Sequence, residues 1–305
     1  MPIETFPTQA GAGAIGPKLS ACIISFNEEA NIARCIDSVS WCDEVVVVDS
    51  FSQDRTARIA RERGARVVQA PWPGHVAQKN RAVDEARGEW IFSIDCDEEV
   101  TPRLKEAVLA AVRSQEPADG YFVSRKLCYL GRWLGHGGWF PEWRIRLFRK
   151  AAGRWAGVDP HDTVQVGGRT ERIPTGGRGI DAAVILHRSF RDLSHQLQVL
   201  DRYTDIQAGE LARAGGRAGP GPVRLLLRPA WRFIWSYFLR LGFLDGAPGF
   251  HMAFNHAYAA YLKYAKLWEI RKGLVVPRAK GDLVPGGSGS AEQIASGSRT
   301  GSVAG

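Results

Sequence analysis

The chain has 305 residues, 45% of them hydrophobic, and a formal net charge of +8 at neutral pH. This length and apolar content are enough for a large domain with a buried core, and the positive charge favours anionic partners such as nucleotides or an acidic membrane surface. The five cysteines show no CxxC or other zinc spacing, which argues against a structural zinc and a disulfide framework and fits a reducing cytoplasm.

The two ends of the chain differ in composition from its middle. Residues 1–17 are small and rich in Gly and Pro, and residues 277–305 are rich in Gly and Ser, so both are predicted to be disordered. Between them we expect an α/β domain over 18–190 and a helical region over 191–276. No secretory signal or membrane-spanning run of about eighteen apolar residues is found.

The first hundred residues alternate between strand and helix patterns. Asn27 is predicted to cap the first helix, and Thr101 with Pro102 to start the helix after the fourth strand. This βα alternation implies right-handed crossovers and a mostly parallel central sheet flanked by helices. The strands are expected at 19–26, 44–50, 65–70 and 90–94, and helices lie between them, including 54–63 and 74–87.

Polar residues follow three of these strands where they end. Ser25 lies at the end of the first and Asn27 just after it, Asp49 lies at the end of the second, and Asp95 and Asp97 follow the fourth. Ligands of such sheets bind beyond the carboxyl ends of the strands. Residues two apart in an extended segment point the same way, so both aspartates could serve Mg²⁺ or Mn²⁺ together with substrate phosphates. The alternative is an acidic turn that stabilises the start of the next helix.

After residue 120 the pattern changes to a period of two. The segments 120–129 and 143–150 are predicted to be antiparallel or edge strands added to the parallel core. Arg144 and Arg146 share one face of the second segment, where they could bind phosphate oxygens. The alternative is a solvated edge strand whose basic residues deter aggregation.

The loop between these two strands is rich in Gly and Trp. Trp133, Trp139 and Trp143 could offer flat apolar surfaces to sugar rings beside His136, and we expect at least one of them to be exposed. The alternative for any one tryptophan is core packing. His187 receives no role, because a lone histidine is more often structural.

The last third of the chain, 187–272, is predicted to be helical with a break at a Gly/Pro cluster. In a helical projection of 223–244, leucines and aromatic residues fall within one arc, and three arginines, Arg224, Arg228 and Arg232, fall opposite. An aromatic face backed by arginines is typical of an interfacial membrane helix. The alternative is that this face packs on the α/β domain.

Several common nucleotide-binding motifs are absent, since the chain has neither a GxGxxG after the first strand nor a GxxxxGK[ST] loop. Four other motifs occur in order: CIISFNEEANIARCIDSV, EVVVVDSFSQDRT, QKNRAVDEARGEWIFSIDCDEEV and GGWFPEWRIRLFRK. Together they resemble family 2 glycosyltransferases of the GT-A fold, and within that family the branch of lipopolysaccharide core β-1,4-glucosyltransferases. The resemblance runs from about residue 19 to 272.

The resemblance implies roles for individual residues. Asp97 would be the principal ligand of Mg²⁺ or Mn²⁺, with Asp95 beside it. The family inverts the anomeric centre, which requires a general base. Relatives usually carry a His-Glu pair where this chain has His161 and Asp162; Asp162 is the expected base, and Asp159 is the alternative. Contacts to the nucleotide or donor sugar would come from Ser25, Asn27, Glu28, Asp49, Lys79, Asn80 and Asp95.

The implied function is transfer of a hexose, expected to be glucose from UDP-glucose, to a lipopolysaccharide-core or other lipid-linked glycan. Arg144, Arg146, His136 and Trp139 would bind the acceptor or phosphate. The protein would be cytoplasmic and peripheral at the inner face of the membrane, in contact with anionic lipid and not with nucleic acid. Two alternatives are a sugar nucleotidyltransferase, which normally has a Gly-rich basic loop after the first strand, and a non-catalytic protein that binds membranes or anions.

Overall fold

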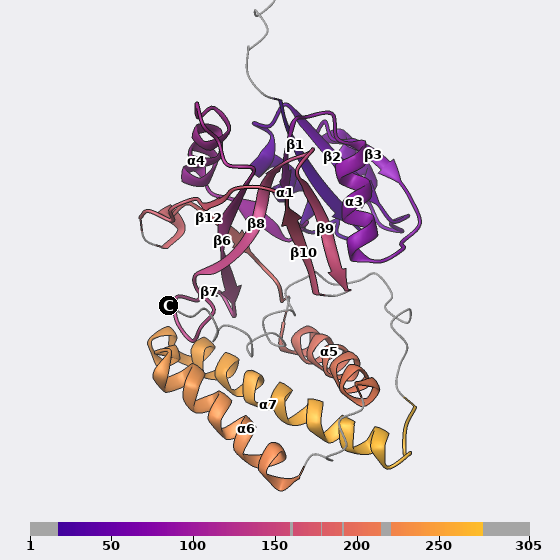
Figure 1. Cartoon of the computed structure of the whole chain (residues 1–305), viewed down its shortest axis with the longest axis vertical. Coiled ribbons are helices and arrows are strands. Elements are labelled where there is room, and N and C mark those ends of the chain that lie inside the picture. Colours follow the sequence, from indigo (N-terminus) through magenta and orange to yellow (C-terminus); the bar gives the residue numbers. More distant parts are fainter. Residues whose placement is uncertain (1–17, 159–160, 178, 191, 215–220, 277–305) are drawn as a thin grey trace, which may run out of the picture.

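The computed structural model describes residues 18–158, 161–177, 179–190, 192–214 and 221–276. It consists of a sheet with helices against it and a separate layer of three long helices (Figure 1). The segments predicted to be disordered, 1–17 and 277–305, lie outside the described residues, as does Asp159.

The first half of the chain forms the predicted parallel sheet. Its strands lie in the order β3-β2-β1-β4, and each neighbouring pair is parallel. Apolar residues occupy both faces of β2 and β4 because helices or further strands cover both sides. The elements are β1 (Leu19–Ser25), α1 (Ile32–Val39), β2 (Glu44–Asp49), α2 (Thr56–Glu62), β3 (Arg66–Gln69), α3 (His75–Glu85) and β4 (Trp90–Ser93).

Beyond β4 the sheet continues with strands from the second half of the chain, in the order β4-β8-β6-β12-β5. Strand β8 pairs antiparallel with both β4 and β6, so the predicted antiparallel strands are confirmed, but the reading of β8 as an edge strand is wrong. The strands are β5 (Glu98–Val100), β6 (Gly120–Tyr129), β8 (Glu142–Arg149) and β12 (Val184–His187); β7 (Arg132–Trp133) and β11 (Thr170–Arg172) also pair with β6.

A separate hairpin, β9 (Gly153–Val158) and β10 (His161–Val166), lies against α3 and was not predicted. Its residues Trp155 and Val164 join an apolar cluster with Val48 and Val83 on one face of the sheet. A larger cluster, which includes Ile32 of α1, fills the other face. The hairpin therefore closes over the side of the sheet that carries α3.

Two local predictions near the strand ends are corrected. Helix α1 begins at Ile32 with Asn31 as its N-cap. Asn27 does not cap it: it adopts a left-handed conformation with φ of 53°, and its Oδ1 accepts from the Gln53 amide at 2.8 Å. The acidic residues after β4 do not start a helix either, since β5 intervenes. Helix α4 (Pro102–Val112) begins instead with the predicted cap, Thr101, which accepts from the Leu104 amide.

The C-terminal layer contains α5 (Leu193–Arg213), α6 (Pro222–Ile234) and α7 (Gly246–Arg271) (Figure 1). The helix predicted over 223–244 ends early, because the chain passes through a π-helical turn, η2 (Trp235–Leu239), and a 3-10 turn, η3 (Gly242–Asp245). A buried cluster of Tyr129, Leu134, Trp139, Leu200 and Met252 joins this layer to β6. Within the described ranges, no helix is long and apolar enough to cross a membrane.

Candidate active site

The ends of β1 and β2 meet, as the sequence predicted. Ser25 Oγ donates to Asp49 Oδ1 at 3.0 Å, and the amide of Ser52 donates to Asp49 Oδ2 at 3.0 Å. The loop after β1 is tied to the same place, because the Glu28 amide donates to Thr56 Oγ1 at 2.7 Å. Asp49 is fully buried, so in this structure its carboxylate organises the two loops at the sheet edge.

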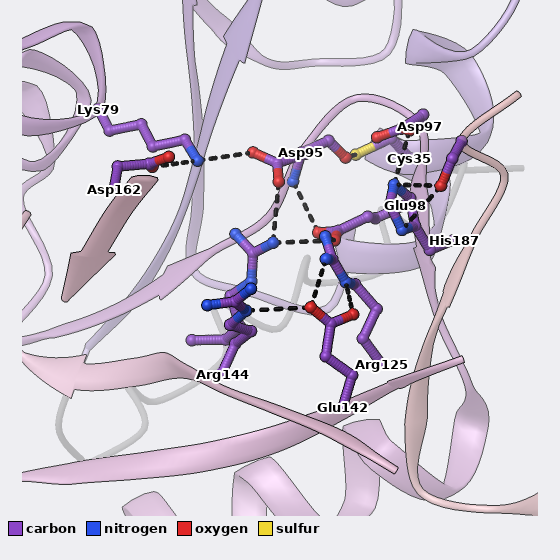
Figure 2. Close-up of polar contacts among 12 residues, drawn as sticks. Cys35, Lys79, Asp95, Asp97, Glu98, Arg125, Glu142, Arg144, Asp162 and His187 are labelled. Atoms are coloured by element: carbon purple, nitrogen blue, oxygen red, sulfur yellow. Dashed lines mark hydrogen bonds and ion pairs between the residues drawn. The ribbon is translucent and has the colours of Figure 1, made fainter. Parts of the chain in front are cut away.

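Asp95 and Asp97 do not face one ligand as expected. Asp95 contacts Lys79, at 3.3 Å, and Arg146, at 2.8 Å, whereas Asp97 Oδ2 lies 2.9 Å from His187 Nε2 (Figure 2). The physical reason is a turn: the Glu98 amide donates to the Asp95 carbonyl at 3.0 Å, so the segment is not extended and the two-residue alternation does not apply.

Asp95 belongs to a row of charged side chains in which acids and bases alternate. The row brings together residues from α3, β5, β6, β8, β10 and the turn after β4, most of them buried. Its members, in spatial order, are Asp162, Lys79, Asp95, Arg146, Glu98, Arg125, Glu142 and Arg144 (Figure 2).

Lys79 contacts two buried carboxylates, Asp95 and Asp162, at once. Its ammonium lies 2.7 Å from Asp162 Oδ2 and 3.3 Å from Asp95 Oδ1. Burial raises the pKa of both carboxyls, but the adjacent cations, Arg146 with Lys79 at Asp95 and Lys79 at Asp162, outweigh it and lower both pKa values. Both acids are therefore ionised at neutral pH.

A pocket opens beside this row, lined by Lys79, Asp95, Arg146, Trp155 and Asp162 among others. Arg146 is buried, and within the described part of the chain its Nε and Nη1 have no hydrogen-bond partner. The Lys79 ammonium also lies 4.2 Å over the Trp155 ring. The pocket is thus lined by two cations, Lys79 and Arg146, beside two ionised carboxylates.

Other predicted site residues make contacts within the protein. The Asn80 amide is occupied by the Trp155 backbone, donating to its carbonyl at 2.8 Å and accepting from its N–H at 3.0 Å. Of His161 only the backbone, which begins β10, is described. Arg144 is half-buried and donates to Glu142 at 3.1 Å.

The Gly/Trp loop is bound to the C-terminal layer. Asp245 accepts from the amides of Gly135 and His136, at 3.0 and 2.8 Å, and lies 3.1 Å from His136 Nδ1. Trp139 is 2% exposed and stacks on His256 with 4.6 Å between ring centroids. It therefore departs from the expected exposed surface for a sugar, because the helical layer covers it.

Sequence reasoning missed Glu98, Arg125, Glu142 and His187. His187 was set aside as a lone histidine, yet it contacts Asp97 across 90 positions of the chain. One signal could have found it: like Asp49, it ends an apolar run, VILH, at a sheet edge. The two glutamates and Arg125 gave no such signal.

The two predicted metal ligands, Asp95 and Asp97, differ in their surroundings. The described ranges contain no group of three or more His, Cys, Asp or Glu side chains placed to hold a metal ion. Mg²⁺ and Mn²⁺, however, commonly take one or two carboxylates and complete their coordination with water and substrate phosphates. The Asp97 carboxylate and the His187 imidazole lie in contact, and both residue types bind metals. Both oxygens of Asp95 already contact cations.

Comparison with known proteins identifies the family. A model described as Glycosyl transferase family 2 matches residues 20–167. An uncharacterized glycosyltransferase of Rickettsia typhi is 31% identical, over 83% of this chain and 87% of its own. The chain belongs to glycosyl transferase family 2. Its α/β architecture is thus the expected GT-A type, with the predicted helices at the C-terminal end.

Two further relatives of this family 2 transferase carry functional names. The lipopolysaccharide core biosynthesis glycosyltransferase LpsC of Rhizobium meliloti is 30% identical, over 82% of this chain and 92% of its own. Among solved structures, glucosyl-3-phosphoglycerate synthase from Mycobacterium tuberculosis, in complex with Mn²⁺, UDP and glucosyl-3-phosphoglycerate, is 29% identical. That match covers 38% of this chain and 45% of the synthase, with a TM-score of 0.32.

Proposed function

We propose that the protein is an inverting, metal-dependent glycosyltransferase that moves a hexose from a UDP-sugar, with UDP-glucose as the first candidate. The acceptor would be a lipopolysaccharide-core sugar or another lipid-linked glycan, reached at the inner face of the cytoplasmic membrane. Family membership supports sugar transfer over nucleotidyl transfer or a purely binding role. The similarity to LpsC over most of both chains supports this acceptor class.

The observation that carries the mechanism is the position of Lys79 between Asp162 and Asp95. An inverting transfer needs a base for the acceptor hydroxyl close to the bond that breaks in the donor. Asp162 lies in one pocket with Asp95, and a single ammonium contacts both carboxylates. These contacts support Asp162 as that base.

The reaction would use these side chains as follows. The acceptor oxygen attacks the anomeric carbon, the bond from that carbon to the diphosphate oxygen breaks, and the hydroxyl proton passes to Asp162. Lys79 and Arg146 would donate to phosphate oxygens of the donor. A divalent cation, when bound through Asp97 and His187, would supply charge that stabilises the departing diphosphate. Once Lys79 turns toward phosphate, Asp162 loses its counterion and becomes a stronger base.

Thermal unfolding in the presence of nucleotides tests this function. UDP with Mn²⁺ should raise the melting temperature, because ligands that bind the native state stabilise it. Asp97→Asn should abolish the metal-dependent part of the rise. Asp84→Asn, an exposed acid paired with Arg154, should keep it.

The proposal would be contradicted if the folded protein showed no rise in melting temperature with UDP, UDP-glucose, GDP or ADP, with or without Mn²⁺. If Asp97→Asn left the metal-dependent rise intact, Asp97 would not be a metal ligand, and the proposed nucleotide site would still stand.

A further inference from the structure

Helix α6 turns apolar side chains outward, to solvent. It is the outermost helix of the C-terminal layer, with α7 on its inner side (Figure 1). The alternative that this whole face packs on the α/β domain is therefore wrong. Five large side chains of α6 and the following turn are between 42% and 67% exposed: Leu226, Leu227, Trp231, Ile234 and Phe238.

This surface continues across η3 and onto α7. The Phe233 ring of α6 lies 5.7 Å from that of Phe250, and Phe250 stacks on Phe254 at 6.5 Å. Further along α7, Tyr258 and Tyr261 stack at 6.3 Å. We call all these residues the apolar face; it also includes the exposed Leu239, Leu241, Phe243 and Leu244 of the turns.

Three cations gather where α6 meets α7. Arg228 donates to the Tyr264 hydroxyl, and Lys263 Nζ lies 5.1 Å from the centroid of the same ring. Burial, then the neighbouring Arg228 and Arg232, lower the pKa of Lys263 to about 8. Arg228 and Arg232 lie opposite the apolar arc of α6, so this cluster adds positive charge to the C-terminal layer without being part of the apolar face.

We propose that the apolar face docks on an anionic lipid bilayer, attracted by the positive charge of the C-terminal layer. Leucine and aromatic side chains beside arginine and lysine suit the boundary between headgroups and acyl chains. Charge favours this occupant, because residues 221–276 contain eight Lys or Arg and two Asp or Glu. A symmetric contact with a second copy would bring two such basic surfaces together. The inference deepens the proposed function by naming the surface that would meet the membrane.

Vesicle flotation with the full chain, without donor or acceptor, tests the docking. Wild type should bind vesicles of 70% phosphatidylcholine and 30% phosphatidylglycerol at least tenfold more tightly than phosphatidylcholine alone. The double variant Leu227→Ser/Trp231→Ser should lose about tenfold in affinity. Ile180→Ser, an equally exposed side chain in the turn Gly179–Asp181, is the matched control and should bind like wild type.

Failure of wild type to bind the anionic vesicles, or unchanged binding by the double variant, would overturn the inference. A wild-type dimer in light scattering that the double variant disperses, without vesicle binding, would assign the face to a second copy. The UDP-dependent rise in melting temperature, measured on the same samples, keeps a failure of docking separate from a failure of the proposed function.

Discussion

Lys79 contacts two carboxylates at once, and its contact with Asp162 affects how readily that carboxylate takes up a proton in the substrate-free protein. Its ammonium stabilises the ionised form of Asp162 and lowers the pKa of that carboxyl. A carboxylate with a lowered pKa takes up a proton poorly, so the base would gain strength only when the ammonium moves to the donor phosphates. In the proposed mechanism, Lys79 would therefore couple donor binding to proton transfer.

The variant Asp162→Asn should lower kcat by about 10² to 10⁴-fold and leave the KM for the UDP-sugar within about threefold, because the amide cannot accept the proton. The exposed Asp181→Asn should match wild type. Steady-state rates with a lipid-linked acceptor check this.

The pH profile of kcat/KM provides a check on the same residue. Because its pKa is lowered, Asp162 stays ionised as pH falls from 8 to about 5, and wild type should show no acid limb in that range. An acid limb near pH 6 to 7 would favour a histidine as the base.

Among single residues, contacts set by the pairing of parallel strands could be predicted from the sequence, whereas contacts set by turns could not. Ser25 and Asp49 end adjacent parallel strands, so their meeting followed from register. Asp95 and Asp97 separate because a turn follows β4, which the apolar run before them does not reveal. The contact between Asp97 and His187 requires the position of β12, which the sequence analysis did not identify as a strand.

At the level of elements, Asn80 joins α3 to the hairpin that carries Asp162. Its amide makes two hydrogen bonds with the Trp155 backbone in β9, and β10 pairs with β9. The lysine one position earlier, Lys79, then reaches Asp162 from the same helix. The amide therefore has a positioning role in this structure, in addition to or instead of the donor contact that the resemblance implied.

Asn80→Ala should lower the free energy of unfolding by about 1 to 3 kcal/mol, since two backbone groups lose their partners. Asn80→Asp keeps an acceptor for the Trp155 N–H but sets a carboxylate oxygen against the Trp155 carbonyl, so it should also lose stability. Urea denaturation measures both. Unchanged stability with a tenfold loss of UDP affinity would restore the role in donor binding.

Helices and strands with a strong hydrophobic periodicity could be predicted from the sequence. Strands that form only by pairing with a partner strand could not. The βαβ order through residue 100 follows from alternating apolar runs and helical spacing. The hairpin sequence GRWAGV has no clear alternation, and it becomes a strand by pairing with β10 and packing on α3. Periodicity shows which residues share the apolar face of α6, but it does not show whether that face contacts another element or solvent.

At the scale of the whole molecule, the alternating row of charges joins both halves of the sheet and makes the stability of the fold sensitive to low pH. Burial raises the pKa of Glu142, but Arg125 and then Arg144 lower it to about 2 from an ordinary 4.5. A carboxyl with a lowered folded-state pKa contributes stability that is present above pH 4.5 and is lost as pH falls toward 2.

We therefore expect Glu142→Gln to be markedly less stable than wild type at pH 6, with the gap narrowing by about 3 kcal/mol between pH 4.5 and 2. Chemical denaturation at several pH values measures the gap. The exposed Glu106→Gln is the control and should show a constant difference. A gap that does not change with pH would contradict the role of the carboxylate charge.

The bond from Asp245 to the Gly/Trp loop has a practical meaning for chimaeric proteins. The loop leaves β7 in the sheet, yet its amides at Gly135 and His136 are held by a carboxylate from the start of α7. Exchanging only the C-terminal helices between relatives would separate these partners. A hybrid meant to acquire another acceptor preference would have to inherit residues 134–140 and the helices as a single unit, although about a hundred positions lie between them in the chain.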